Sequence, residues 1–167
     1  NGVSTRVQEM DWSNDWDVAS ICYKNNIPYL FHLKSTTGLM HINKLTEDGI
    51  ISTRTDDQTW TAGWNIAECA NFATESYLFH YKKESGLVHI NKISDSGLIS
   101  TRVFDNNIET GYDLSSSVEI NGNNYIVLLN SSTKKFKIYK LSADGIELNS
   151  ILSKTFTDKF DSIAVVK

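Results

Sequence analysis

The sequence predicts an all-β protein made of β-propeller-like blades, each of four antiparallel strands, with a β-trefoil as the alternative fold. Three observations lead to this prediction: a repeat of 48 residues, an alternation of apolar and polar side chains, and short turns rich in Gly, Asp, Asn and Ser. Period-two alternation indicates strands, and such turns join strands into hairpins. Repeats of about this length are typical of propellers and other repeat arrays.

The repeat runs through residues 1–167, which we therefore treat as a single all-β repeat domain. Its copies are residues 4–51, 52–99 and 100–148, followed by a partial copy at 149–167. Aromatic residues recur one period apart at Trp16, Trp64, Tyr112 and Phe160, and glycines recur at Gly49, Gly97 and Gly145. Positions that keep their character from copy to copy are expected to form the framework of the fold.

Within a copy, four short strands follow one another. In the second copy we expect them at residues 65–72, 76–82, 87–93 and 98–103. The first strand is rich in small residues, such as Ala67 and Ala70. Small side chains suit the innermost strand of a blade, which is crowded by its neighbours near the axis of a propeller.

The second and third strands of a copy have a predicted register. A four-residue turn closed by Gly86 places Phe79 opposite Ile90, and it places His80 opposite His89. One face of the hairpin is then aromatic and aliphatic, which makes a good cross-strand core, and the other, half-exposed face carries the histidines. The same register pairs Phe31 with Ile42 and His32 with His41 in the first copy, and Leu128 with Lys137 in the third.

The strand count separates the two candidate folds. One further strand is expected before Asp11 and another after Phe156, which gives fourteen strands where a trefoil has twelve. Three blades leave open sheet edges. We therefore expect either a homo-oligomer, with a dimer completing a propeller as the simplest case, or a segment of a longer polypeptide.

Composition excludes several classes of protein. The chain has 40% hydrophobic and 22% charged residues, a net charge of −4 and a pI near 5.5. These fractions fit a folded globular protein. The acidic balance argues against nucleic acid as a partner, which needs a basic surface. No apolar run is long enough for a membrane span, and the first residues do not form a signal peptide, so we expect a mature product or an excised segment.

The two tryptophan positions of the repeat differ in how much their residue type changes from copy to copy. Trp16 and Trp64 stay aromatic in each copy and are assigned to the core. Trp12 and Trp60 become Ile108 and Phe156 in later copies, so they are the better ligand candidates. Tryptophan stacking with polar neighbours is a common way to bind the apolar face of a sugar. Arg6 and Glu9 precede Trp12, and Arg54, Asp56 and Asp57 precede Trp60. With the two tryptophans, the candidate ligand-binding set consists of Arg6, Arg54, Asp57, His32, His41, His80 and His89.

The remaining chemistry-bearing residues point to no reaction. The arginines that recur at position 54 and its equivalents bind a ligand or protect a sheet edge, and both interpretations stay open. The histidine pairs have no recurring third ligand, so we expect no metal and no cofactor. Cys22 and Cys69 are not equivalent in the repeat, and we expect two small, buried free thiols, with a disulfide between them as the alternative. Polar residues directly after the core aromatic are interpreted as turn caps: Asp17, Asn65, Asp113 and Asp161.

The repeat resembles a known family. Gly63-Trp64, an apolar strand, Tyr-Leu-Phe-His-Tyr-Lys at 77–82 and Val-His-Ile-Asn-Lys-Ile at 88–93 are similar to tandem-repeat β-propeller blades of secreted bacterial proteins, in the style of tachylectin and tectonin-type propeller lectins. The resemblance implies a secreted, non-enzymatic, multivalent lectin whose partners are glycans or glycoproteins. The alternative is a structural or protein-interaction module of a larger secreted protein or toxin. Motifs of enzymes, such as a nucleophile elbow or a phosphate loop, do not occur.

Overall fold

The protein is all-β. The computed structural model describes residues 8, 13–158 and 162–163, and within these residues there are twelve strands and no helix. No helix in this part of the chain therefore has the length and apolar character needed to cross a membrane. The strands are β1 (Val18–Lys24), β2 (Ile27–Leu33), β3 (Leu39–Leu45), β4 (Ile51–Thr59), β5 (Ile66–Asn71), β6 (Ser76–Tyr81), β7 (Leu87–Ile93), β8 (Ile99–Asn107), β9 (Leu114–Ile120), β10 (Asn123–Asn130), β11 (Lys135–Leu141) and β12 (Leu148–Thr155).

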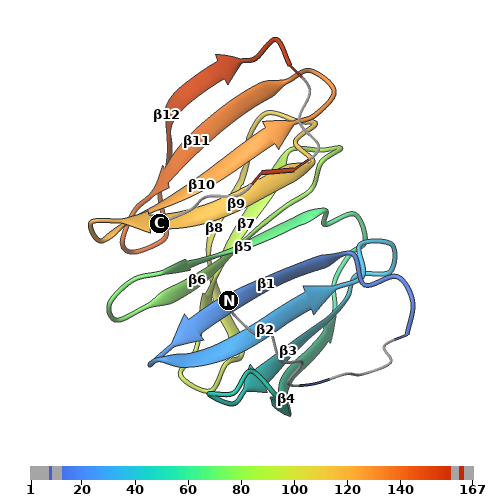
Figure 1. Ribbon diagram of the computed structural model, residues 1–167, viewed down its shortest axis with the longest axis vertical. Coiled ribbons are helices and arrows are strands. Elements are labelled where there is room, and N and C mark those ends of the chain that lie inside the picture. The colour runs from blue at the N-terminus through green and yellow to red at the C-terminus, as the bar shows by residue number, and fades with distance from the viewer. Residues whose placement is uncertain (1–7, 9–12, 159–161, 164–167) are drawn as a thin grey trace, which may run out of the picture.

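Each repeat forms one antiparallel sheet of four strands (Figure 1). Sheet 1 contains β1–β4, sheet 2 contains β5–β8 and sheet 3 contains β9–β12, each in chain order. The third strand of the second copy occupies the predicted range, whereas β8 extends beyond residue 103 to Asn107. The two further strands expected before Asp11 and after Phe156 lie for the most part outside the described residues.

The predicted hairpin register is confirmed. Phe79 pairs with Ile90 and His80 with His89, and the equivalent pairs occur in sheets 1 and 3. The outer strands are longer than expected because they carry β-bulges, which let one strand accommodate additional residues. In sheet 2 the register shifts between Ile90 and Asn91.

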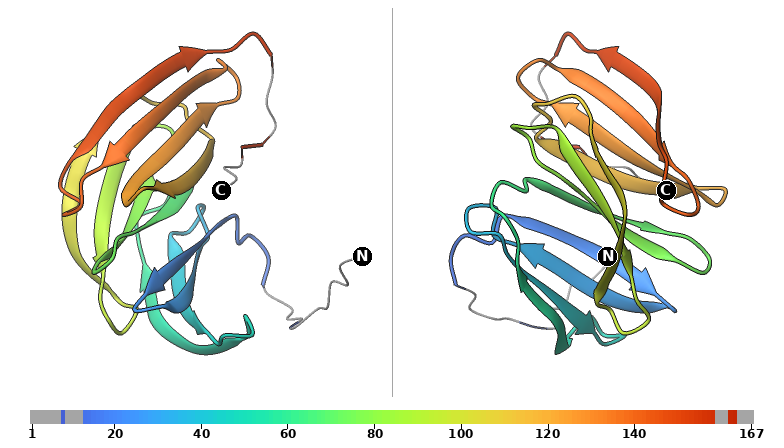
Figure 2. Two further views of the ribbon diagram at one scale, coloured as in Figure 1. Left: turned by 60° about the vertical axis from the view of Figure 1, so that its left-hand side comes forward. Right: turned by 180° about the vertical axis from the view of Figure 1, so that it is seen from behind.

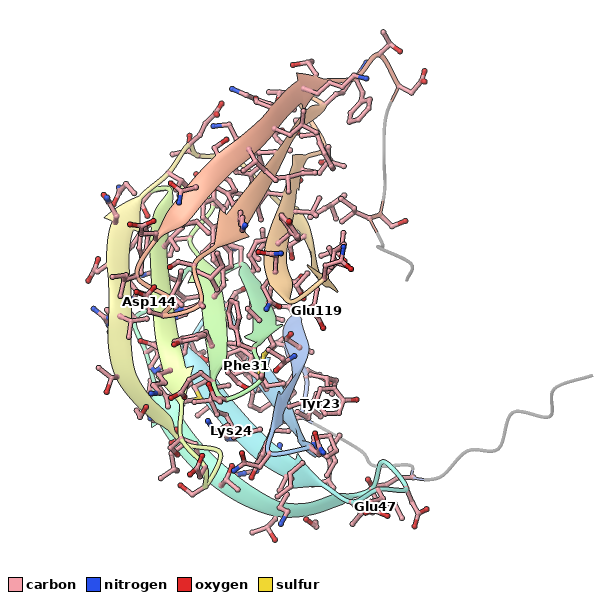
Figure 3. All side chains as sticks on the ribbon, turned by 90° about the vertical axis from the view of Figure 1, so that its left-hand side faces the viewer. Tyr23, Lys24, Phe31, Glu47, Glu119 and Asp144 are labelled. Carbon is pink, nitrogen blue, oxygen red and sulfur yellow. A yellow bond between two sulfur atoms is a disulfide. The ribbon has the colours of Figure 1, made fainter. Side chains whose placement is uncertain are left out.

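The three sheets fan out from their first strands (Figure 2). Strands β1, β5 and β9 lie side by side, and the outer strands β4, β8 and β12 follow the convex side (Figure 3). The crowding of the first strands explains their small residues: Ala67 and Ala70 are both buried.

Two apolar clusters join the sheets, one between sheets 1 and 2 and one between sheets 2 and 3. Each boundary repeats the same tyrosine–glycine contact. The ring of Tyr77 packs on Gly145, where an added Cβ would lie 2.7 Å from the ring, and Tyr29 packs on Gly97 in the same way. Both glycines have positive φ, at 76° and 77°, so the turn and the contact together explain their recurrence.

The prediction of free thiols is wrong. Cys22 and Cys69 form a disulfide with a Cα–Cα distance of 5.2 Å, which is within the usual range. The two residues are not equivalent in the repeat because the bridge joins neighbouring sheets: Cys22 lies on β1 and Cys69 on β5.

The predicted turn caps are confirmed at three positions. The backbone N–H of Ser35 donates to Asp17 at 2.8 Å, that of Lys83 to Asn65 at 2.9 Å and that of Ser131 to Asp113 at 2.8 Å. Each bond fixes the segment after the second strand of its sheet to the segment before the first. Asp161, the fourth predicted cap, lies outside the described residues.

Candidate functional site

An open cavity of about 600 Å³ lies where the end of β4 passes over sheet 2. We call it the first groove. It is lined by Gln58, Trp60, Thr61, Trp64, His80, His89, Asn91, Ile99, Ser100 and Arg102. Three of the predicted ligand-binding residues, Trp60, His80 and His89, are thus brought together at one place.

Trp60 is held in position from both sides. Its ring stacks on His80, with centroids 4.5 Å apart and an interplanar angle of 26°. Its indole Nε1–H donates to Gln58 Oε1 at 3.1 Å. The Gln58 amide donates to Asp56 at 3.0 and 3.1 Å, and Asp56 accepts the backbone N–H of Ile99 at 2.9 Å. This chain of hydrogen bonds anchors the indole to sheet 2 through β8.

Trp64 belongs to the framework, as predicted. It is only 2% exposed. The Lys82 ammonium lies 4.8 Å from its ring centroid, and its ring contacts His80 and His89 at 4.3 and 4.6 Å between centroids. A ligand in the first groove therefore finds the half-buried Trp60, not Trp64, as its aromatic platform.

The histidines do not lie on a half-exposed face, and this prediction is wrong. His80 is 2% exposed and His89 is 7% exposed, because the ring of Trp64 packs on both imidazoles and the ring of Trp60 stacks on His80. His80 accepts a hydrogen bond from the Asn91 amide at 2.8 Å. Burial lowers the pKa of His80 well below its usual value, and burial and Arg102 lower that of His89. Both rings are neutral at pH 7.

The charged side of the groove is formed by β8. Arg102 Nη1 donates to Asp105 Oδ2 at 2.9 Å, and Asp105 Oδ1 lies 3.4 Å from His89 Nε2. About half of the Arg102 side chain is exposed. A guanidinium has five N–H donors, so donors remain for a ligand. With Asn91 and Ser100 the groove combines an aromatic surface with several hydrogen-bonding groups.

Four other predicted residues lie on sheet 1. Arg54 pairs with Asp57 at 3.0 Å, and Asp57 lies 3.7 Å from His41. His32 and His41 are buried. None of these residues lines the first groove. The predicted residues Trp12 and Arg6 lie outside the described residues.

Sequence reasoning did not place Asp56, Gln58, Asn91 or Arg102 at this groove, although the recurring arginines left Arg102 open as a ligand-binding residue. The alternation of a strand contained a signal for the first two, because Asp56, Gln58 and Trp60 are spaced by two and so share one face of β4. The other two are one period after Asn43 and Arg54, which places them on the sheet that Trp60 covers.

The corresponding place between sheets 2 and 3, the second groove, is filled differently. Ile108, Leu128 and Lys137 stand where the first groove has Trp60, His80 and His89. Glu109 binds Lys135 at 2.5 Å and Lys137 at 3.1 Å. The aromatic platform is therefore replaced by apolar side chains and an ion-pair cluster.

No family model and no curated protein matches this chain. Among solved structures, the chain is similar to the crystal structure of an exo-beta-1,3-galactanase from Clostridium thermocellum, with a TM-score of 0.55 and 9% sequence identity. The match covers 79% of this chain and 34% of that one, so the chain spans about a third of that enzyme's length. At this identity the likeness concerns the fold alone.

Proposed function

We propose that this protein is a non-enzymatic recognition protein that binds carbohydrate in the first groove. The observation that carries the proposal is the position of Trp60, which is fixed by Gln58 and His80 at the wall of an open cavity that also holds Asn91 and Arg102. A fixed aromatic ring beside hydrogen-bonding groups suits a sugar, whose one face is apolar and whose hydroxyls donate and accept. The galactanase named above makes galactose-containing glycans reasonable first probes, although a shared fold does not imply a shared function.

We further propose that the sheets are blades of a propeller. The four strands of each repeat pair with one another within the described residues, and the sheets fan from their first strands. This arrangement favours blades over the trefoil alternative. The similarity to tachylectin and tectonin-type propeller lectins agrees with it.

A non-enzymatic role is supported by the chemistry of the acids near the grooves. Asp105 is paired with Arg102, and Glu109 with two lysines, so both carboxylates are engaged in ion pairs. A secreted location is supported by the disulfide between Cys22 and Cys69, because disulfides persist in oxidising compartments.

A glycan array tests the proposal directly. We expect the purified chain to bind a subset of glycans and Trp60→Ala to lose binding by about two- to tenfold, since aromatic stacking contributes about 0.5–1.5 kcal/mol. The matched control is Ile108→Ala, at the equivalent position of the second groove, which should bind like the parent protein. Absence of binding across the array, or equal binding by both variants, would contradict the proposal.

The second candidate function, a protein-interaction module, is favoured by an open apolar face on sheet 3. A cavity of about 470 Å³ is lined there by residues of the sheet, among them Tyr125, Val127, Phe136 and Ile138, and by Ile163 of the chain's own C-terminal segment. In sheet 2 the equivalent residues, Tyr77, Phe79, Val88 and Ile90, are buried in the cluster between sheets 2 and 3. We propose a second copy of the chain as the occupant, in a homo-oligomer of which a dimer is the simplest case.

Light scattering tests this assembly. We expect a dimer or larger oligomer for the parent protein and a monomer for Ile138→Lys, because a charge on the buried face is costly to desolvate. The control is Ile146→Lys, at an isoleucine that is already exposed on a turn. A parent protein that remains monomeric would rule out the second copy as occupant.

A further inference from the structure

We infer that the protein has a further ligand site, separate from the first groove, which takes a sugar with a free amino group. The site is an open cavity of about 580 Å³ at the turns that follow β1, β5 and β9. We call it the turn cavity. Its lining includes residues 23–26 of sheet 1, residues 71–74 of sheet 2, and Glu119 and Gly122 of sheet 3. Figure 3 is viewed from the side on which these turns lie and labels Tyr23, Lys24 and Glu119. The turn cavity shares no residue with the first groove, so this inference goes beyond the proposed function.

Equivalent positions of the three copies line the turn cavity, but their residue types differ. Two positions of the repeat line it in every sheet: Tyr23, Asn71 and Glu119, and Asn26, Thr74 and Gly122. The framework positions, by contrast, keep their character from copy to copy. A ligand in the turn cavity therefore meets a different side chain from each sheet, and we expect one such site per chain.

Hydrogen bonds between the sheets hold the walls of the turn cavity in place. The backbone N–H of Tyr23 donates to Asn71 Oδ1 at 3.0 Å, and the backbone N–H of Asn71 donates to Asn124 Oδ1 at 3.2 Å. The Asn124 amide donates to the backbone carbonyl of Asn71 at 2.9 Å. The site is thus formed before a ligand arrives, which reduces the entropy lost on binding.

The positive charge at the turn cavity is already neutralised. Lys24 is only 5% exposed, and its ammonium donates to the backbone carbonyl of Thr74 at 2.8 Å. The same ammonium lies 3.2 Å from Glu75 and 3.3 Å from Asp95. An ammonium has three N–H donors, so Lys24 has none left for a ligand. An anionic ligand would therefore find no free donor on this lysine.

The carboxylate of Glu119 is the charge that remains available. Its Oε1 accepts the backbone N–H of Gly122 at 2.8 Å, and no residue that the structure describes forms an ion pair with it. The side chain is exposed, so its second oxygen can accept from a ligand. Carboxylates form their strongest hydrogen bonds with cationic donors, and this charge therefore favours a ligand with an ammonium group.

The neutral groups beside Glu119 favour a sugar as the carrier of that ammonium group. The N–H groups of the Asn71 side chain have no partner among the described residues, and Asn26 and Thr74 are exposed. Amides and hydroxyls both donate and accept hydrogen bonds, as the hydroxyls of a sugar do. The methylenes of a lysine side chain would leave these groups without partners. The turn cavity thus suits an amino sugar better than a basic peptide.

Calorimetric titration with two disaccharides that differ in charge tests this site. The probes are β-1,4-linked diglucosamine, below the pKa of its amines, and its neutral di-N-acetylated form. We expect one site per chain for the charged probe and about five- to tenfold weaker binding of the neutral probe, as the loss of a partly exposed ionic hydrogen bond predicts.

Glu119→Gln keeps an acceptor for the Gly122 N–H and should therefore fold. This variant should bind the charged probe about five- to tenfold more weakly and lose the preference for it. The matched control is Glu47→Gln, at an exposed glutamate on the turn after β3. It removes the same charge outside the turn cavity, so it should bind like the parent protein.

Two more variants separate the turn cavity from the first groove. Asn26→Gly retains a residue that adopts the φ of 61° found there. It should weaken both probes by a similar factor of about two to ten, because a neutral hydrogen bond is lost. Trp60→Ala should leave the affinity for the charged probe unchanged.

Four outcomes would overturn the inference. Binding of the charged probe that is lost in Trp60→Ala and kept in Glu119→Gln would place the amine in the first groove. Equal affinity for both probes, or no binding of either by a protein that binds other glycans, would leave only the proposed function. Tighter binding of an oligolysine peptide than of diglucosamine would identify a basic peptide as the partner. If diglucosamine binds as expected but no glycan on the array depends on Trp60, the proposed function fails and this inference stands.

Discussion

The first and second grooves share one framework and differ in their lining. Each is formed where an outer strand passes over the next sheet, and each has an aromatic residue buried at its base, Trp64 or Tyr112. In the first groove the outer strand contributes Trp60 and its hydrogen-bonded support. In the second it contributes Ile108, and an acidic side chain next to it binds two lysines.

This difference shows which positions of the repeat carry the fold and which carry the chemistry. The framework tolerates only other aromatic residues at the base, because the cavity left by a smaller side chain would be costly. The lining tolerates exchange of a histidine for a leucine because both are buried and of similar size. A copy can therefore lose its groove without losing its sheet.

The largest expected effect concerns the sheet boundaries. Only the boundary between sheets 1 and 2 carries the disulfide found in the described residues; the equivalent positions at the next boundary are Ala70 and Ser117. Replacing both cysteines by serine should lower the free energy of unfolding by about 4 kcal/mol, because the bridge closes a loop of 47 residues. Urea unfolding measures this.

The boundary between sheets 2 and 3, which lacks a disulfide in the described residues, provides the control. Adding Ala70→Cys and Ser117→Cys to the serine variant should form the equivalent bridge between sheets 2 and 3 and regain much of the lost stability. Reduction of the parent protein should reproduce the loss. Equal stability of the parent and serine proteins would show that the bridge contributes nothing.

The second effect concerns pH. His80 faces His89, Arg102 and Lys82, and its pKa is lowered mainly by burial. The folded state thus binds fewer protons than the unfolded state. The contribution of His80 to the free energy of unfolding is therefore complete above about pH 6.5 and is lost as the pH falls. For His32, whose pKa is lowered to about 4, the loss runs from about pH 6.5 to about 4.

Importing the second groove's residues should weaken this dependence. His80→Leu with Asn91→Tyr should reduce the slope of unfolding free energy between pH 6.5 and 5 by up to about 1.4 kcal/mol per pH unit, which corresponds to one proton. Leu128→Ala, the control, should lower stability by about 2–5 kcal/mol at every pH without changing the slope. An unchanged slope in the double variant would show that His80 titrates normally.

Sequence alone predicted the all-β class, the four-stranded antiparallel repeat, its period and the hairpin register, because these depend on alternation and on turn residues that act locally. Phe79 opposite Ile90 follows from the position of Gly86 alone. The sequence alone could not predict the contacts between neighbouring sheets. Cys22 and Cys69 seemed unrelated because repeat equivalence describes positions within a sheet, whereas the bridge depends on which faces meet.

The candidate site shows the same limit. Trp60 was found because its identity varies between copies, and His80 and His89 because they recur as a pair. Their burial was not predicted, because it depends on Trp64, which lies in the segment before β5 and packs on both rings. Arg102 was left undecided, because its place at the groove follows from the way β4 crosses sheet 2.

The third effect concerns the support of Trp60. Gln58→Leu removes the acceptor of the indole N–H and should lower stability by about 1 kcal/mol, with a several-fold loss of glycan binding because the ring is no longer fixed. Asn106→Leu, at the equivalent exposed position of β8, should change stability by about 0.5 kcal/mol or less. Urea unfolding and glycan titration together measure both changes. A loss of stability without any loss of binding would show that Trp60 does not contact the ligand.

The smallest effect is expected for the ion pairs that distinguish the grooves. Glu109→Gln removes the carboxylate that binds Lys135 and Lys137, yet the change in unfolding free energy should stay within about 1 kcal/mol, because exposed ion pairs are weakened by solvent and salt. Hydrogen bonding to Lys135 lowers the pKa of Glu109, so the contribution is present above the carboxyl's usual pKa and is lost in acid. Asp105→Asn in the first groove is the matched variant. If both changes are small and both disappear in 1 M salt, the lysines of the second groove fill space without stabilising the boundary between sheets 2 and 3. The stability of that boundary then does not depend on the lining of the groove. A change well above 1 kcal/mol for Glu109→Gln alone would instead mean that the ion pairs took over a structural role when the aromatic platform was lost.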